Sequence, residues 1–197
     1  FYFVGGPGGS GLASADSYLS SFDPSLTENM DIVFVDQRGT GPVHGLSCSL
    51  AQSRFAIAPA PLTDPDAILS SARTYVQDCT AELGADSLLP VVNTEQAIRA
   101  SELFRERIGA PKVWLYGESY GTQLVQAYAT QFPQAVKGVI LDGVVDLTLP
   151  AEGFYRRYTL ASEKLLAETF DLCVGIPACK ADIPQGAAAV YDDLAAR

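Results

Sequence analysis

Short apolar runs alternate with longer segments of helical periodicity over the first 150 residues. The runs are residues 1–4, 31–36, 113–116 and 136–141. A continuous apolar run between polar residues is typical of a strand buried on both faces of a parallel sheet. Strands that alternate with helices predict an α/β architecture: a mostly parallel sheet, helices on both of its faces, and a site at the carboxyl ends of the strands.

Three segments between the runs have apolar residues at helical spacing, and glycine or proline follows the first two. They are residues 67–83, 94–108 and 122–132. Residues 42–66 are rich in Ser, Ala and Pro and are predicted to be a long surface excursion. After Pro150 the pattern is helical only, over 154–169 and 186–197. The predicted domains are therefore 1–150, the core, and 151–197, the start of a helical cap.

The chain begins within a predicted strand and ends within a predicted helix that has no glycine cap. We therefore expect it to be a fragment of a longer polypeptide.

Charge and hydropathy narrow the possible partners. The 13 basic and 23 acidic residues give a net charge of −10. An acidic chain without a basic patch repels phosphate backbones, which argues against nucleic acid as a partner. No apolar run approaches the about 18 to 20 residues of a membrane-spanning helix, so no membrane partner is expected either.

The four cysteines, Cys48, Cys79, Cys173 and Cys179, form no CxxC pair, and a single histidine, His44, completes no common zinc site with them. Pairing by proximity predicts the disulfides Cys48–Cys79 and Cys173–Cys179. By restricting the unfolded chain, they would stabilise the fold by about 3.5 and about 2 kcal/mol, respectively. Disulfides indicate an oxidising compartment, so a secreted or periplasmic protein is expected. Four reduced thiols in a cytosolic protein remain the alternative. No metal site is predicted.

The residues 117–121, GESYG, match the pattern GxSxG directly after a predicted strand and directly before a predicted helix. Such a turn lifts the serine hydroxyl above the sheet, at the positive end of a helix. Ser119 is therefore the candidate nucleophile, and the N–H of Tyr120 is a candidate donor to the oxyanion of acyl transfer. The alternative is a serine that only caps the helix.

A glycine-rich loop, GGPGGSG at residues 5–11, follows the first strand. Without side chains, its amides can approach a substrate carbonyl closely, so Gly5 or Gly6 is the expected second oxyanion donor. A phosphate-binding loop is the competing interpretation, but the segment lacks GxGxxG spacing and a Gly-Lys-Ser/Thr ending, and Pro7 removes one amide.

Four motifs occur in one order: GGPGGSG, DQRGTG at 36–41, GESYGT at 117–122 and LDGVVD at 141–146. Together they resemble the peptidases of the proline iminopeptidase and tripeptidyl aminopeptidase family, which have the α/β-hydrolase fold. The cysteine-bearing segment after DQRGTG resembles the secreted tripeptidyl aminopeptidase branch. Val4 and the sequence from Pro42 to His44 depart from the usual pattern, which leaves the substrate preference open.

The resemblance implies a triad in the order Ser, Asp, His. His44 precedes the serine and is favoured as a loop residue, and Asp142 and Asp146 are favoured as turn residues. We therefore expect a missing C-terminal segment or a second chain to supply the Asp and the His, and the chain alone to be almost inert.

Substrate contacts are expected from carboxylates. GESYG also occurs in serine carboxypeptidases, where the glutamate helps to hold the substrate's terminal carboxylate, so Glu118 is a candidate contact. Aminopeptidases of this kind bind the free α-amino group with carboxylates, commonly from the cap, and Glu152, Glu163 and Glu168 are available, although a solvated helix face explains them as well. Arg38 is expected either to pair with a carboxylate under the glycine loop or to be an ordinary surface residue.

The favoured function is a serine hydrolase, an exopeptidase that releases residues or short peptides from N-termini through an acyl-enzyme on Ser119. The substrate would be a peptide or a small ester. No cofactor is implied. A carboxylesterase, a serine carboxypeptidase-like enzyme and a noncatalytic module of the same fold are the alternatives.

Overall fold

The structure, a computed structural model, describes residues 1–61, 63–84 and 88–196. The chain divides into two compact units, Phe1–Val145 and Asp146–Arg197. Leu62 of the predicted excursion and Arg197 of the last predicted helix lie outside the described residues. In the described part of the chain, no helix is both long enough and apolar enough to cross a bilayer.

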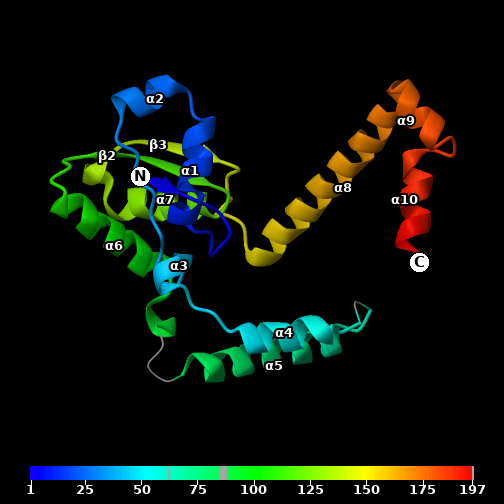
Figure 1. The fold of residues 1–197 in the computed structure, drawn as a ribbon, viewed down its shortest axis with the longest axis horizontal. Helices are drawn as coiled ribbons and strands as arrows, with labels where there is room; N and C mark the ends of the chain where they lie inside the picture. The colour runs from blue at the N-terminus through cyan, green and yellow to red at the C-terminus, as the bar shows by residue number, and fades with distance from the viewer. Residues whose placement is uncertain (62, 85–87, 197) are drawn as a thin grey trace. The chain divides into compact units, whose positions relative to one another are not determined.

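The first unit is built on a parallel sheet of β1 (Tyr2–Phe3), β2 (Val113–Glu118) and β3 (Val136–Asp142), in that spatial order (Figure 1). Phe3 is in register with Gly117, and Glu118 with Asp142. Because the strands are parallel, their carboxyl ends share one edge of the sheet. The residues that follow β1, β2 and β3 therefore lie close together at that edge.

Helices cover both faces of this sheet, as the sequence predicts. Successive side chains of a strand point to opposite faces. Phe3 and Leu115 pack into the core with α6 (Thr94–Arg107) and α7 (Gly121–Gln131), which lie next to one another on that face (Figure 1). Tyr2 points to the other face, where its ring lies 4.8 Å from that of Tyr18 on α1 (Gly11–Ser21).

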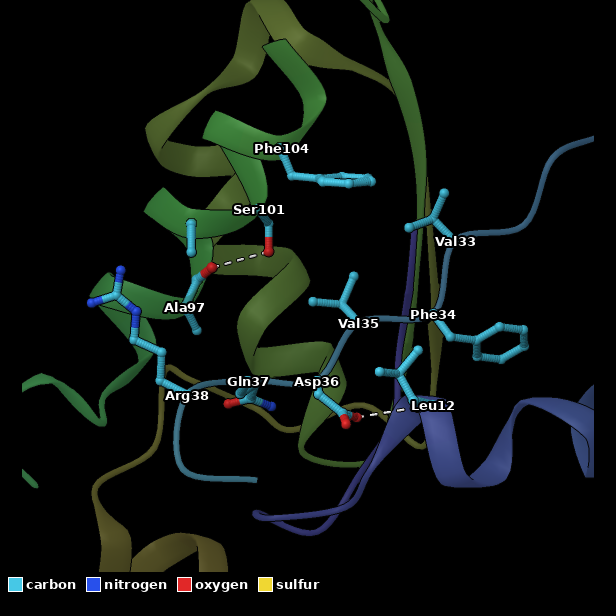
Figure 2. Close-up of a pocket in the computed structure, with 11 residues that line it drawn as sticks. Leu12, Val33, Phe34, Val35, Asp36, Gln37, Arg38, Ala97, Ser101 and Phe104 are labelled. Carbon is cyan, nitrogen blue, oxygen red and sulfur yellow. Dashed lines mark hydrogen bonds between the residues drawn. The ribbon is translucent and has the colours of Figure 1, made fainter. Parts of the chain in front are cut away.

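The strand expected at 31–36 is only partly formed. Phe34 makes a single parallel bridge to Tyr2, whose N–H donates to the carbonyl of Val33 at 2.9 Å, and the apolar residues of the segment are half-buried rather than buried. In the described residues this segment has a neighbouring strand on one side only. Figure 2 shows Val35 pointing toward α6 and Phe34 pointing away from it. Both residues line a cavity of about 280 Å³.

The excursion at 42–66 is more ordered than the sequence indicates. After the single turn α3 (Gly41–His44), α4 (Ser49–Ile57) and α5 (Pro65–Leu83) pack side by side (Figure 1). The predicted disulfide Cys48–Cys79 joins them. The carboxylate of Glu82 accepts from the backbone N–H groups of the first turn of α4, at 3.0 and 3.3 Å. The helix α4 has no apolar stripe of its own, so its contacts with α5 stabilise it.

The remaining elements of the first unit are short: α2 (Pro24–Asn29), η1 (Leu89–Val91) and η2 (Pro133–Ala135). The second unit contains α8 (Ala151–Gly175), α9 (Pro177–Asp182) and α10 (Ala187–Ala195). The second predicted disulfide, Cys173–Cys179, joins α8 to α9, and the ring of Phe170 lies 5.4 Å from that of Tyr191. Helices are the regular elements of this unit's described residues, as expected, but α8 continues to Gly175 and α9 lies where the sequence predicted no helix between 169 and 186. The assignment of the unit as a cap that begins at residue 151 stays a prediction.

A buried carboxylate joins α6 to α7. Glu102 is 8% exposed and accepts from the Tyr128 hydroxyl at 2.5 Å and from two nitrogens of Arg105 at 2.7 and 2.8 Å. These hydrogen bonds, the Arg105 bonds foremost, lower the pKa of Glu102 below its ordinary value. The charged form is therefore favoured in the folded state.

A lowered pKa in the folded state stabilises the protein above the unfolded pKa, about 4.3 for Glu, and this contribution is lost as the pH falls. We expect Glu102→Gln to lower the free energy of unfolding by about 2 kcal/mol at pH 7 and by much less below pH of about 4. Urea unfolding at several pH values measures this. The control is Glu95→Gln, because Glu95 is paired with Arg99 on the exposed side of the same helix. A deficit that stays constant with pH would contradict the assignment.

Candidate active site

Ser119 occupies the sharp turn between β2 and α7. Its φ is +52°, the only positive φ of a non-glycine residue in the described part of the chain. A non-glycine residue in this region of φ/ψ space costs of order 1 kcal/mol or more and persists only where the surroundings enforce it. The residue is exposed, so its hydroxyl is presented to solvent rather than buried.

The flanking glycines are required by close backbone approach. A Cβ at Gly117 would lie 2.5 Å from the carbonyl oxygen of Gly121, and a Cβ at Gly121 would lie 2.1 Å from the carbonyl oxygen of Phe3. Neither position can therefore carry a side chain without displacing the backbone. This explains the spacing of the GxSxG pattern in physical terms.

Hydrogen bonds on both sides of Ser119 hold the strained turn. Its N–H donates to the carbonyl of Asp142 at 2.7 Å, and its carbonyl accepts from the N–H and the hydroxyl of Thr122 at 3.0 and 2.7 Å. The Thr122 hydroxyl, fully buried, also accepts from the N–H of Val145 at 2.9 Å. Thr122 thus joins the turn to the loop after β3. The sequence does not reveal this role, although Thr122 ends the motif GESYGT.

The glycine loop lies directly against the serine. A Cβ at Gly5 would lie 2.8 Å from the Cβ of Ser119 and 3.4 Å from its Oγ. Gly6 follows with a φ of +131°, and the loop is closed by a bond from the N–H of Gly9 to the carbonyl of Gly5 at 3.2 Å. Two segments more than 100 residues apart in sequence are therefore in contact at the carboxyl edge of the sheet.

Tyr120 continues from Ser119 into α7, and its hydroxyl lies 3.1 Å from that of Thr94 at the start of α6. Its N–H has no hydrogen-bond acceptor among the described residues. Beside its ring and the glycine loop is a cavity of about 300 Å³, lined in part by Pro7, Gly8 and Arg38. The hydroxyl of Ser119, the amide of Tyr120 and the glycine loop thus lie at one place on the molecule.

The carboxylate that supports the glycine loop is Asp36. It accepts from the hydroxyl of Ser10 at 2.9 and 3.1 Å. It also accepts from the N–H of Leu12 at 3.1 Å, a bond drawn in Figure 2. Gly41 lies so close that a Cβ there would be 1.9 Å from Asp36 Oδ2. Arg38, expected either to pair with such a carboxylate or to be a surface residue, is exposed and makes no ion pair within the described residues. The sequence places Asp36 at the end of the apolar run but does not show that it is paired with Ser10.

Glu118, the candidate substrate contact, points to the face of the sheet that carries α1. Its Oε2 accepts from the hydroxyl of Tyr18 at 2.5 Å and, at the longer distance of 3.4 Å, from that of Tyr2. The hydrogen bond to Glu118 raises the pKa of Tyr18. On the same strand, Tyr116 donates to the carboxylate of Asp142 on β3 at 2.6 Å, a bond that raises the pKa of Tyr116 to about 12. A contact between Glu118 and substrate stays a prediction.

The other candidates are dispersed. His44 is exposed at the end of α3, and within the described residues no side chain hydrogen-bonds to the Ser119 hydroxyl. Asp146 of the second unit accepts from Thr148 and from Arg157. Glu152, in the same unit, is exposed in the first turn of α8. Among the described residues, no group of three or more His, Cys, Asp or Glu is placed so that it could hold a metal ion.

The sequence of this chain is similar to those of known hydrolases. A family model described as alpha/beta hydrolase fold matches residues 2–162. The serine protease Hip1 of Mycobacterium tuberculosis is 30% identical over 148 residues, which cover 72% of this chain and 28% of the relative. The tripeptidyl aminopeptidase of Streptomyces lividans is 33% identical over 153 residues, 74% of this chain and 28% of the relative. The putative hydrolase YuaR of Escherichia coli is 26% identical over 167 residues, 83% of this chain and 32% of the relative. The chain thus spans about a third or less of the length of these relatives.

Proposed function

The chain belongs to the α/β-hydrolase fold family, and on that premise we propose that it carries the nucleophile and the oxyanion hole of a serine peptidase that acts at N-termini. The observation that supports this most directly is the pair formed by Ser119 and Gly5. An exposed serine is held at positive φ against the backbone of a glycine loop. The names of the relatives, a serine protease and a tripeptidyl aminopeptidase, favour a peptidase and an N-terminal site of attack.

In the proposed mechanism, Ser119 Oγ attacks the carbonyl carbon of the scissile bond while a histidine removes the hydroxyl proton. The N–H of Tyr120 and an N–H of Gly5 or Gly6 stabilise the negative oxygen of the tetrahedral intermediate. The histidine then gives its proton to the leaving amine as the C–N bond breaks, and an acyl-enzyme remains on Ser119. Water, deprotonated by the same histidine, hydrolyses this ester and regenerates the serine.

The histidine and the aspartate that orients it are proposed to lie outside residues 1–197, in the same polypeptide or in a second chain. His44 is a poor candidate because it is exposed on α3 and precedes the serine. The protein is proposed to be secreted or periplasmic, since two disulfides need an oxidising compartment. No cofactor is required by this mechanism.

The test is to treat the complete protein that contains these residues with a fluorophosphonate and to map the adduct by mass spectrometry. Peptidyl anilides with free and with blocked N-termini, peptides with a free C-terminus, and short acyl esters are then assayed in parallel. We expect an adduct on Ser119 and selective cleavage of substrates with free N-termini. Turnover of esters alone would indicate a carboxylesterase, removal of C-terminal residues a carboxypeptidase, and absence of both adduct and turnover a noncatalytic module.

A further inference from the structure

An oxyanion hole works only if its donors are placed within a few tenths of an ångström of the developing charge. Here one proposed donor comes from the glycine loop. The nucleophile and the other proposed donor, the N–H of Tyr120, come from the turn after β2, more than 100 residues later. Gly5 and Ser119 are in close contact, because a Cβ added at Gly5 would lie only 2.8 Å from the Cβ of Ser119. Some feature of the fold must therefore fix the loop relative to the serine.

The glycine loop leads directly into α1, so a shift of this helix also shifts the loop. Ser10 ends the loop and caps α1, since its hydroxyl accepts from the N–H of Ala13 at 3.0 Å. Only Gly11 of this helix is buried, so packing alone does not fix α1 firmly. Asp36 fastens its first turn. A second attachment is needed farther along the helix, and Tyr18 provides it.

Tyr18 connects α1 to the residue that precedes the nucleophile. Its hydroxyl donates to Glu118 Oε2 at 2.5 Å, across 100 residues of sequence. The aromatic ring is held independently, 4.8 Å from the ring of Tyr2 and 6.1 Å from that of Phe34. A hydrogen bond to a carboxylate is shorter and stronger than one between neutral groups. Because Glu118 is covalently bonded to Ser119, any shift of α1 is resisted at the nucleophile itself.

We propose that Glu118 is a positioning residue that, through the hydroxyl of Tyr18, holds the glycine loop at its working distance from Ser119. The inference rests on the proposed function, because it assigns a task within the oxyanion hole. It competes with direct binding of substrate by Glu118. A carboxylate that binds substrate acts mainly on KM and does not need Tyr18. A carboxylate that positions the loop acts on kcat, and its effect disappears when Tyr18 loses its hydroxyl.

The experiment uses the complete protein and four variants: Tyr18→Phe, Glu118→Leu, Glu118→Gln and the double variant Tyr18→Phe/Glu118→Leu. Tyr18→Phe keeps the ring contacts and removes only the donor, and Glu118→Gln keeps an acceptor oxygen. The control is Tyr191→Phe, which removes a hydroxyl from a tyrosine of α10. The readouts are the second-order rate constant of fluorophosphonate labelling, and kcat and KM for a peptidyl anilide.

We expect Tyr18→Phe and Glu118→Leu each to lower the labelling rate and kcat by about 10-fold, with KM within about 2-fold of the wild type. The double variant should lose no more than either single variant, because both remove the same bond. Glu118→Gln should keep most of the rate, and Tyr191→Phe all of it. Urea unfolding of each variant, with all rates measured well inside the folded range, separates positioning from stability.

Three results would overturn the inference. Labelling of Tyr18→Phe at the wild-type rate would show that the bond is not needed, even if the variant is less stable. A rise in KM with unchanged kcat in Glu118→Leu would assign Glu118 to substrate binding. If the wild type itself is not labelled at Ser119, the proposed function is wrong, and the inference that rests on it is wrong too. If the wild type is labelled and Tyr18→Phe is labelled equally fast, only the inference is wrong.

Discussion

Replacing Ser119 with alanine is expected to lower kcat by at least about 10⁴-fold, because the acyl-enzyme has no other oxygen on which to form. The fold should survive. Ser119 is exposed, and the bonds that hold the turn use its backbone N–H and carbonyl, which alanine retains. The measurements are kcat on a peptidyl anilide and fluorophosphonate labelling of the complete protein.

Ser119→Gly separates the strain from the chemistry. Glycine adopts positive φ at no steric cost, whereas alanine at a φ of +52° carries the same penalty as serine. We therefore expect Ser119→Gly to be more stable than Ser119→Ala by about 1 kcal/mol, although both are inactive. The matched pair is Ser70→Gly and Ser70→Ala within α5, where the order should reverse, since glycine costs about 1 kcal/mol in a helix interior. If alanine were more stabilising than glycine at both positions, the result would argue against a strained turn at Ser119.

The sequence predicted most of the elements because their signals are local. The apolar run from Val113, the glycines around Ser119 and the helical spacing after Thr122 act within a few residues of each other. The partial strand around Phe34 was overestimated, because an apolar run cannot say how many neighbouring strands pair with it. The helix α4 was missed because Glu82, 31 and 32 residues from the N–H groups that it accepts from, satisfies its first turn.

In the candidate site, too, the sequence predicted the residues of short motifs but not the contacts between distant segments. Ser119, Tyr120 and the glycine loop carry their chemistry in short motifs, so their positions could be chosen from the sequence. Three supporting contacts could not: Asp36 with Ser10, Thr122 with Val145, and Tyr18 with Glu118. Each joins segments 23 to 100 residues apart through residue types that are common on any surface. A sequence shows which groups are available, and only the fold shows which of them are paired.

Gly5→Ala tests whether the glycine loop forms part of the oxyanion hole. Gly5 lies outside the left-handed region, so its backbone conformation accepts alanine, and the effect must come from crowding. The new methyl group would meet the Cβ of Ser119 at 2.8 Å and the carbonyl oxygen of Glu118 at 3.1 Å. Both belong to the rigid turn, so the loop has to move away from Ser119 and carry its N–H groups with it.

We expect Gly5→Ala to lower kcat and the labelling rate by about 10²- to 10³-fold, the usual loss when one oxyanion donor is removed, with a much smaller change in KM. The control is Gly175→Ala in α8, where a Cβ meets nothing within 4 Å and φ is not positive. It should leave both rates unchanged. Because a displaced loop weakens only the stabilisation of the negative oxygen, the loss should be similar for anilide and ester substrates. A Gly5→Ala variant labelled at the wild-type rate would mean that the loop contributes packing but no donor, and the second oxyanion donor would then have to come from another segment.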